Sequence, residues 1–156
     1  RVDGTTIRVV GMHLDLSGLW RRRQAHAILA HLAERDAPLP TVLMGDLNEW
    51  SSQGGCLRDF GSHHQFAPCG RSFHARRPIA QLDRIMVSPD LEILASGAHA
   101  SATSRRASDH LPVWAEIMPV GEAQPVPPSF SGRSTAGGWA ARLRSSIVSQ
   151  SRKGRR

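Results

Sequence analysis

The sequence contains little cysteine and no long apolar run. Only two of the 156 residues are cysteine, Cys56 and Cys69, and no C-x-x-C spacing relates them. This arrangement indicates neither a zinc site nor a disulfide framework, and it favours a reducing compartment. No stretch of about eighteen apolar residues occurs, so the sequence offers no candidate for a membrane-spanning helix. We therefore expect a cytoplasmic location, with peripheral attachment to a membrane as the alternative.

The amino-terminus lacks the features of a targeting signal. The chain opens with RVDGTTIRVV, which has no initiator Met and no charged n-region followed by an apolar h-region. Because it enters a strand-like pattern almost at once, we expect a fragment from which upstream residues are missing. The sequence also has no G-x-S-x-G motif, no P-loop and no zinc-spaced Cys and His array. Serine hydrolase, P-loop nucleotide-binding and zinc-finger functions are thereby disfavoured.

Acidic residues are scarce only at the carboxy-terminal end. The net charge is +7, but residues 119–156 hold seven basic residues against one acidic residue, Glu122, so the remainder is nearly neutral. A field acts where its charges lie, so the basic total says little about what the body of the protein binds. A near-neutral body disfavours a dedicated duplex-DNA nuclease, which would carry a basic footprint.

The composition predicts one folded domain followed by an extension. With 40% hydrophobic and 21% charged residues, the chain is typical of a single globular domain. Beyond Pro119, a stretch rich in Pro, Ser and Gly precedes a basic segment containing Trp139, Leu143 and Ile147. We predict a domain over residues 1–118 and a linker with a basic tail over 119–156. We expect this tail to be disordered, with contact to an anionic surface as the alternative.

Hydrophobic patterns predict a strand, a helix and four further strands. Residues 5–13 alternate around Ile7, Val9 and Met12 and predict a strand. Residues 19–36 predict a helix with Ser17 as its N-cap and an apolar stripe formed by Ala25, Ile28, Leu29 and Leu32. The further strands are predicted at 41–45, which is expected to be buried on both faces, and at 81–88, 91–101 and 111–118. Residues 51–78 are expected to be loop-rich, and the arginines at 21–23 to form a solvated helix face.

Ionisable and amide side chains stand where the predicted strands begin or end. A buried sheet cannot hold a lone carboxylate, so these groups are expected to gather at one sheet edge. Carboxylates, an amide and imidazoles together suit a hard divalent cation and a phosphate. Taken singly, each residue has another interpretation, as a turn former or a surface pair. The residues concerned are His13, Asp46, Asn48, Asp83, Asp109 and His110, whereas His63, His64, His74 and His99 are expected to be loop or surface histidines.

Four motifs in order resemble a known family. VVGMHLDL, TVLMGDLNEW, QLDRIMVS and SDHLPVWAEI resemble the carboxy-terminal half of the endonuclease/exonuclease/phosphatase superfamily, over about residues 5–118. The stretches RRRQ and RSFHARRPIAQLDRI are similar to those of bacterial members of unassigned substrate. The resemblance implies an α+β chain that forms part of a four-layer α/β/β/α sandwich with the deoxyribonuclease-I-like fold, its amino-terminal half missing.

The resemblance implies catalytic roles for residues after the first two motif strands. His13 would contact the scissile phosphate or protonate the leaving oxygen. Asp46 would orient and deprotonate the attacking water. Asn48 would hold the phosphate and share the metal environment.

The resemblance also implies roles for the third and fourth motifs. Asp109 would be a metal-site carboxylate, and His110 would bind the phosphoryl oxygens as charge builds. Asp83 would bond to His110 and fix its tautomer and direction, as carboxylates do for other imidazoles. The implied cofactor is Mg²⁺, with Mn²⁺ as the alternative, and the implied metal ligands are Asp46, Asn48 and Asp109.

The sequence departs from the family pattern in three respects. Leu47 stands where the family usually has Phe, and Arg84 stands where an aromatic residue often follows the third-motif Asp. The family's amino-terminal half, which supplies an Asn and a Glu as metal ligands and a further acid, has no counterpart here. We therefore expect weak metal binding by this chain alone and an uncovered apolar face.

Two functions follow as hypotheses. The first is a metal-dependent phosphohydrolase that acts as a phosphodiesterase, nuclease or phosphomonoesterase on a nucleic acid, lipid head group or small molecule. The second is a catalytically silent fragment that acts as a binding module through its basic tail. Neither hypothesis requires an obligate protein partner.

Overall fold

The structure is a computed structural model that describes residues 4–35 and 38–121. The predicted linker and tail over 119–156 lie almost wholly outside the described residues. The described part contains helices and strands in the order β1 (Arg8–His13), α1 (Gly18–Ala33), β2 (Thr41–Asp46), α2 (Cys56–Gly61), β3 (Gln65–Phe66), β4 (Asp83–Val87), β5 (Leu91–Ala98), α3 (Ser104–Ala107) and β6 (Val113–Pro119).

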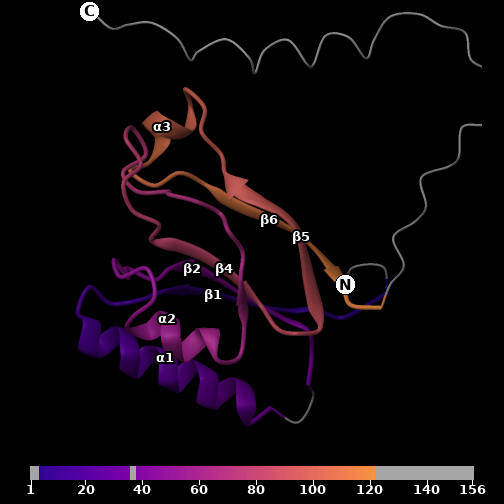
Figure 1. The fold of residues 1–156 in the computed structure, drawn as a ribbon. Coiled ribbons are helices and arrows are strands. Elements are labelled where there is room, and N and C mark those ends of the chain that lie inside the picture. The colour runs from indigo at the N-terminus through magenta and orange to yellow at the C-terminus, as the bar shows by residue number, and fades with distance from the viewer. Residues whose placement is uncertain (1–3, 36–37, 122–156) are drawn as a thin grey trace, which may run out of the picture. The chain divides into compact units, whose positions relative to one another are not determined.

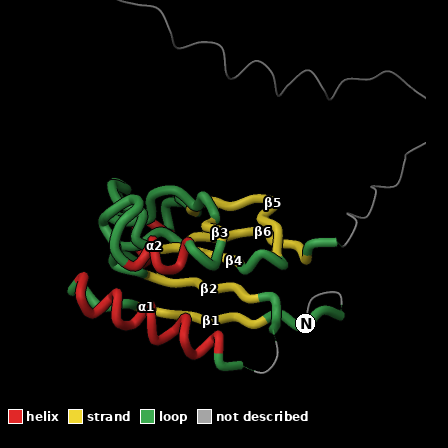
Figure 2. Tube along the Cα trace, turned by 60° about the horizontal axis from the view of Figure 1, so that its bottom comes forward, coloured by secondary structure: helices red, strands yellow, loops and turns green. Residues whose placement is uncertain are grey.

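The strands form two sheets, and the two longer helices lie on one side of the larger one. That sheet has the order β1-β2-β4-β3, in which β1 and β2 are parallel while β4 is antiparallel to both β2 and β3. Strands β5 and β6 form an antiparallel pair. Helices α1 and α2 cover one face of the larger sheet, and the β5–β6 pair lies on its other side (Figures 1 and 2). Among the described residues, no helix combines the length and apolar character needed to cross a membrane.

Helix α1 packs through the stripe that its spacing predicts. Ala25 is buried, and Ile28, Leu29 and Leu32 are partly buried against the core. Ser17 stands at the N-cap as expected, but its side chain makes no capping hydrogen bond. Its backbone N–H instead donates to Asp15 Oδ1 at 2.7 Å. The helix start is therefore fixed by a turn in the preceding segment.

The arginine run at 21–23 is not a uniformly solvated face, and that prediction is wrong for Arg21. Arg21 is 8% exposed and forms a buried ion pair with Glu49, its Nη2 lying 3.3 Å from Oε2. Arg22 remains on the surface beside Asp59, and the Arg23 guanidinium lies 4.8 Å from the centre of the Trp20 ring. One charge of the run is therefore part of the interior.

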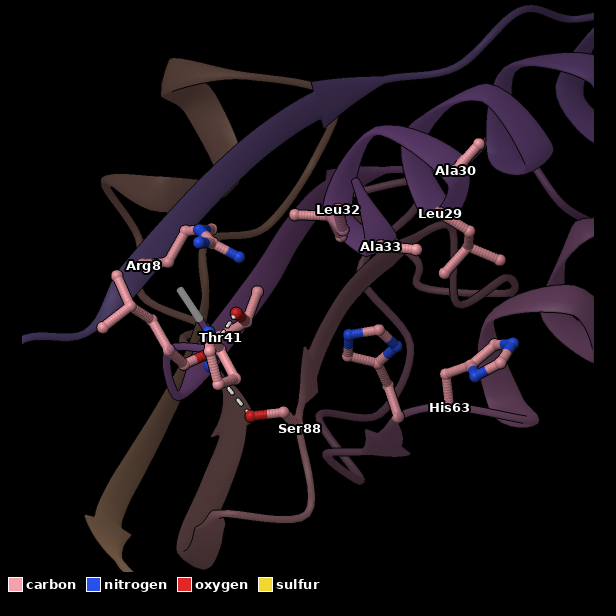
Figure 3. A pocket seen from close by; sticks show the side chains of 11 residues that line it. Arg8, Leu29, Ala30, Leu32, Ala33, Thr41, His63 and Ser88 are labelled. Carbon is pink, nitrogen blue, oxygen red and sulfur yellow. Dashed lines mark hydrogen bonds between the residues drawn. The ribbon is translucent and has the colours of Figure 1, made fainter. Parts of the chain in front are cut away.

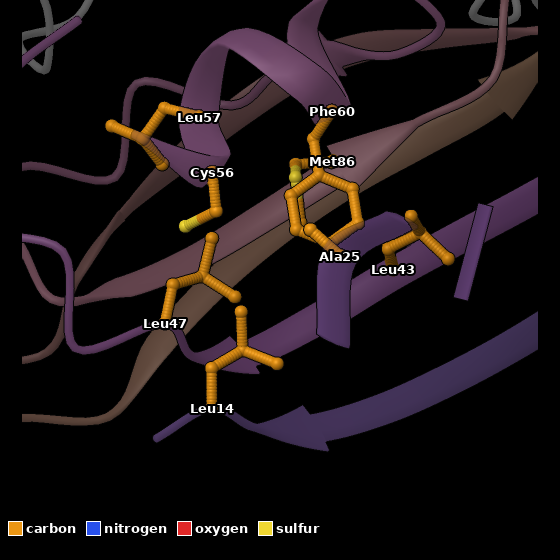
Figure 4. Close-up of a cluster of buried hydrophobic side chains, with 8 residues drawn as sticks. All are labelled: Leu14, Ala25, Leu43, Leu47, Cys56, Leu57, Phe60 and Met86. Carbon is orange, nitrogen blue, oxygen red and sulfur yellow. The ribbon is translucent and has the colours of Figure 1, made fainter. Parts of the chain in front are cut away.

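The larger core lies between the sheet and the two helices. Leu43 of β2 and Met86 of β4 point toward Phe60 of α2 and Ala25 of α1, and all four side chains are fully buried (Figure 4). Burial of a side chain as large as Phe60 contributes about 1.5–3 kcal/mol. The loop-rich prediction for residues 51–78 missed this role, because α2 is a short helix that supplies both Phe60 and the buried Cys56.

A second core lies between the sheet and the β5–β6 pair. Val42, Ile85 and Val87 are buried there, and Val113, Ala115 and Ile117 of β6 pack against them as their alternation predicts. Cys69 belongs to this core and Cys56 to the other, and both thiols are free. Burial and the charge of Glu49 raise the pKa of Cys56 to about 11, so the thiol stays protonated.

Part of the face between β1–β2 and β6 is open within the described residues. Val9 is 59% exposed, Met44 37% and Trp114 47%, and they line an apolar groove of about 380 Å³. The prediction that residues 41–45 are buried on both faces is therefore wrong at Met44. The two faces of β1 also differ from the expected pattern, because Val9 faces this groove whereas Met12 packs against the helix-side core. An uncovered apolar face was expected, and the groove is such a face.

Gly45 permits β1 and β2 to approach closely where the polar residues begin. Its φ is +145°, and a Cβ there would lie 1.8 Å from the carbonyl oxygen of Met12. Gly11 on the adjacent strand has open space around the corresponding position. Only glycine therefore fits at residue 45 without moving the backbone of β1.

Replacing Gly45 by Ala is expected to lower the free energy of unfolding by about 2 kcal/mol or more, because it adds both backbone strain and a clash with the partner strand. Urea denaturation would measure the loss. The matched control is Gly11→Ala, for which we expect a change within about 0.5 kcal/mol. Equal changes in the two variants would contradict the importance of this close approach.

A second pocket opens at the edge of the sheet where β1 and β2 begin. It has a volume of about 470 Å³ and is lined by Arg8, Thr41 and Ser88 beside apolar residues of α1 such as Leu29 (Figure 3). The Thr41 N–H donates to Ser88 Oγ at 2.8 Å, which joins the start of β2 to the end of β4. His64 also lines it, and burial lowers the pKa of His64. His64 thus lies in a loop, as one of the two alternatives predicted, and it is partly buried there.

Candidate active site

The strand register brings three of the predicted residues into one row. His13 ends β1 and pairs with Asp46, which ends β2, and Asp46 pairs in turn with Asp83, which begins β4. Parallel strands β1 and β2 end at the same edge, and antiparallel β4 starts there. The row therefore follows from the directions of the strands, with one ionisable side chain supplied by each.

The Asp46 carboxylate lies between two imidazoles. Its Oδ2 is 3.6 Å from His13 Nε2 and 3.8 Å from His110 Nε2. Its Oδ1 accepts a hydrogen bond from the backbone N–H of Asn48 at 2.8 Å. The Asp46 side chain is 15% exposed, so solvent screens these charges only in part.

Asn48 links the segments that follow β1 and β2. It is 7% exposed and has a positive φ of 49°, a conformation that Asn tolerates better than most residues. Its Nδ2 donates to the Leu14 carbonyl at 2.8 Å, which leaves the side-chain oxygen for another partner. The amide is held rigidly beside Asp46.

His110 is oriented by Asp83, and Asp83 by Ser72. His110 Nδ1 donates to Asp83 Oδ2 at 2.7 Å, and the Ser72 hydroxyl donates to the same oxygen at 2.5 Å. The Nδ1 bond turns Nε2 toward Asp46 and fixes the direction of the ring. Burial lowers the pKa of His110, but the hydrogen bond to Asp83 and the charges of Asp83, Asp46 and Asp109 outweigh it, so the net pKa is raised.

Asp109 differs from the other acids because it is exposed. Its backbone carbonyl accepts a hydrogen bond from the Ala75 N–H at 2.6 Å, and Ser108 Oγ lies 3.5 Å from its Oδ1. The backbone of Asp109 is therefore anchored, while its carboxylate is exposed to solvent. Asp109 nevertheless adds its negative charge to the surroundings of His110.

All six residues singled out from the sequence line one pocket. It has a volume of about 640 Å³, and its remaining walls are apolar. The pocket is lined by His13, Leu16, Asp46, Asn48, Trp50, Phe73, Leu82, Asp83, Asp109 and His110. The structure thus brings together the residues predicted to act together, while the individual roles stay predictions.

The donor set fits a metal ion only in part. Among the described residues, Asp46, Asp83 and His110 offer ligand atoms within 4.8 Å of one another. His110 and Asp83 are already hydrogen-bonded to each other. The three residues are therefore better described as an imidazole oriented by a carboxylate than as a complete set of metal ligands. Of the predicted ligands, Asp46 belongs to the trio, whereas Asn48 and Asp109 complete an oxygen-rich pocket around it.

Sequence reasoning missed several residues that shape this pocket. Ser72 is fully buried and holds Asp83, and its carbonyl also accepts a hydrogen bond from the Leu111 N–H at 2.9 Å. The Phe73 ring lies 4.9 Å from the His110 ring and 5.8 Å from the Trp50 ring. Trp50 ends the second motif, and Ser72 and Phe73 precede the third. Proximity to a motif was the sequence feature that could have indicated that these residues belong to the site.

Glu49 was missed for a different reason. It lies next to Asn48, yet it is 6% exposed and faces Arg21 of α1. Its Oε1 accepts a hydrogen bond from the Ser51 N–H at 3.0 Å, so it also shapes the turn after the motif. Nothing in the sequence around Glu49 indicates that its ion-pair partner lies on helix α1.

Solved structures with similar folds include several proteins from bacteria. A functionally unknown conserved protein from Enterococcus faecalis V583 is 26% identical with a TM-score of 0.61, and the match covers 71% of this chain and 49% of that chain. A mannosyl-6-phosphatase from Bacteroides thetaiotaomicron VPI-5482 is 23% identical with a TM-score of 0.63, covering 74% and 52%. An endonuclease/exonuclease/phosphatase family protein from Bacteroides thetaiotaomicron is 20% identical with a TM-score of 0.61, covering 75% and 51%.

The chain spans about half the length of these solved structures. The shared fold confirms the mixed helix and strand class and the deoxyribonuclease-I-like architecture predicted from the sequence. No curated protein matches the chain. The model of the Endonuclease/Exonuclease/phosphatase family matches residues 2–110, which is more than half of the sequence. With its fold and its motifs in agreement, the chain belongs to the endonuclease/exonuclease/phosphatase family.

Proposed function

We propose that this chain forms part of a Mg²⁺-dependent hydrolase of phosphoric esters, in which the candidate active site binds the phosphate. The family consists of hydrolases that are typically metal-dependent. One solved relative of similar fold is a mannosyl-6-phosphatase, which supports a phosphoric ester as the substrate class. The proposal concerns the chemistry of the pocket and leaves the ester open to phosphodiesters and phosphomonoesters.

The observation that carries the proposal is the position of the Asp46 carboxylate between two imidazoles at one end of the sheet. A carboxylate there orients a water molecule and accepts its proton as the water attacks phosphorus. The imidazoles on either side provide donors for the phosphoryl oxygens. Phosphoryl transfer depends chiefly on such positioning and charge stabilisation.

His110 and His13 have different surroundings and therefore different proposed roles. His110 is held by Asp83 with a raised pKa, which keeps the ring cationic over a wider pH range and suits it to bind phosphoryl oxygens. The His13 side chain is 75% exposed and its Nε2 lies 3.6 Å from Asp46 Oδ2, so the ring is open to solvent. We assign protonation of the leaving oxygen to His13.

Asp46, the Asn48 side-chain oxygen and Asp109 would hold a divalent cation in this proposal. The cation would supply positive charge against the phosphate oxygens. The three protein oxygens are too few to enclose it, which agrees with Mg²⁺ retaining several waters. Asp83 is left to its bond with His110 and is not assigned to the metal.

The proposal is tested by hydrolysis of bis(p-nitrophenyl) phosphate and p-nitrophenyl phosphate with Mg²⁺ present. We expect turnover by the unmodified chain and its loss in Asp46→Ala and His110→Ala. The matched control is Asp90→Ala, because Asp90 is an exposed carboxylate in the turn between β4 and β5, away from the pocket.

Calorimetric titration with Mg²⁺ separates this function from the silent binding module. Binding that is lost in Asp46→Ala supports the metal-dependent site. No turnover together with no Mg²⁺ binding would favour the silent alternative. The reason to test that alternative is that the chain spans only about half the length of its solved relatives. Equal turnover in all four proteins would rule out the assigned residues.

A further inference from the structure

The wall of the candidate active site beside His110 is built from aromatic rings. Phe73 lies against His110 with ring centroids 4.9 Å apart, and Trp50 lies against Phe73 at 5.8 Å in a T-shaped arrangement with an interplanar angle of 83°. Phe73 also pairs with His110 through an isolated backbone bridge. Phe73 therefore stands between the imidazole and Trp50, and we call Phe73 and Trp50 the aromatic wall.

Trp50 is unusually exposed for a residue that lines a pocket. Its exposure is 62%, while Phe73 beneath it is only partly exposed. Trp20, another exposed tryptophan, is accompanied by the Arg23 guanidinium on α1 and is outside the pocket lining. Because Trp50 contacts the Phe73 ring and still keeps 62% of its surface exposed, much of its ring system is available to a ligand.

The lining of the pocket combines two kinds of surface. His13, Asp46 and His110 present charge and hydrogen-bonding groups, whereas the aromatic wall and the 82% exposed Leu16 present apolar surface. A ligand that satisfies both has a phosphate at the polar side and a flat apolar group attached to it. Stacked or edge-to-face ring pairs add to the free energy gained from buried area, so a ring is favoured over an alkyl group of similar size.

From this arrangement we infer that the substrate is a phosphoric ester whose phosphate carries an aromatic group, and that Trp50 determines this specificity. The inference rests on the proposed function, because it takes the phosphate position from His110 and Asp46. A ring attached to a phosphate bound at His110 would lie beside the aromatic wall, where Trp50 offers exposed ring surface. Trp50 is a specificity residue here, since it contacts the organic group and leaves the proton transfers to the histidines and Asp46.

Two phosphonates that are not hydrolysed test the inference on the full chain. Phenylphosphonate and methylphosphonate share the charged group and differ in the ring, and calorimetry with Mg²⁺ present gives the ratio of their dissociation constants. We expect phenylphosphonate to bind about fivefold more tightly, the size of effect that a ring pair produces. In Trp50→Ala the ratio should fall to about one, and Trp50→Phe should retain part of the preference.

The matched control is Trp20→Ala, which removes an exposed tryptophan outside the pocket and should keep the ratio of the unmodified chain. Equal affinity for both phosphonates in the unmodified chain, or an unchanged ratio in Trp50→Ala, would overturn the inference and leave the proposed function standing. Binding of neither phosphonate would remove the phosphate site itself, and with it both the proposed function and the inference. Because Trp50 is exposed, loss of folding in its variants is not expected, and circular dichroism checks this.

Discussion

Replacing Asp83 by Asn is expected to lower kcat/KM for phosphoric ester hydrolysis by roughly 10³- to 10⁴-fold, the size of loss seen when a carboxylate that orients a catalytic imidazole becomes an amide. Asp83 Oδ2 accepts hydrogen bonds from both His110 Nδ1 and Ser72 Oγ. An amide in its place removes the negative charge and permits the other tautomer of the ring. His110 would then no longer present a cationic Nε2 toward the phosphate.

The same substitution has a readout that does not depend on catalysis. The pKa of His110 is raised in the folded chain despite burial, because Asp83 bonds to the imidazolium and neighbouring carboxylates attract it. Protonated His110 therefore stabilises the fold fully below the unfolded value, about 6.5, and this stabilisation is lost as the pH rises through the folded value. In metal-free Asp83→Asn, we expect the His110 titration followed by NMR to move to lower pH.

The matched control for this prediction is Asp59→Asn. Asp59 Oδ2 lies 3.3 Å from His26 Nε2, so the chain contains a second carboxylate and imidazole pair outside the pocket. We expect this variant to retain its kcat/KM and its His110 titration. If Asp83→Asn and Asp59→Asn behaved alike in both measurements, the orienting role of Asp83 would be refuted.

Replacing Arg21 by Ala is expected to lower the free energy of unfolding by about 3–5 kcal/mol, because it leaves a buried carboxylate without its partner. The Arg21 and Glu49 side chains are 10% and 7% exposed. Arg21 also donates to the carbonyl of Leu16 at 2.6 Å, so one side chain fastens α1 to the segments after both β1 and β2. Urea denaturation of the unmodified and variant chains would measure the loss.

Arg22→Ala is the neighbouring control. The Arg22 side chain is 58% exposed and its Nε lies 3.5 Å from Asp59 Oδ2, so its removal should cost no more than about 1 kcal/mol. Adding Glu49→Gln to Arg21→Ala should recover part of the stability, because the unpaired charge is removed with its partner. A loss for Arg21→Ala no larger than for Arg22→Ala would show that the buried pair is unimportant.

The strands and the pocket could be predicted because their signals are local. Alternating or continuous apolar residues predicted β1, β2, β4 and β6. A polar residue stood where each of these strands begins or ends. Once the strands are placed in a sheet, their ends must meet at its edges, so His13, Asp46 and Asp83 could be expected together. The helix α1 was found from its apolar stripe for the same reason.

The remaining features depend on contacts between distant segments. Arg21 carries no mark that distinguishes it from Arg22 and Arg23, and only the position of Glu49 after β2 makes it an interior residue. Ser72 lies in a stretch without periodicity, so its bond to Asp83 could not be anticipated. Helix α2 has six residues, too few for a periodic pattern to establish it, yet it supplies Phe60 to the core.

The single row formed by His13, Asp46 and Asp83 makes the chemistry sensitive to strand alignment. A slip of one residue between β1 and β2 would set His13 beside Gly45 and turn the side chains of one strand to the opposite face. Such a misaligned molecule would retain its secondary structure and much of its hydrophobic packing while its acid and imidazoles no longer met. Gly45 opposes that outcome, since no other residue of β2 tolerates the contact made at its position. Accurate pairing of two neighbouring strands is thus a precondition for any turnover, and measurements of helix and strand content alone would not reveal its loss.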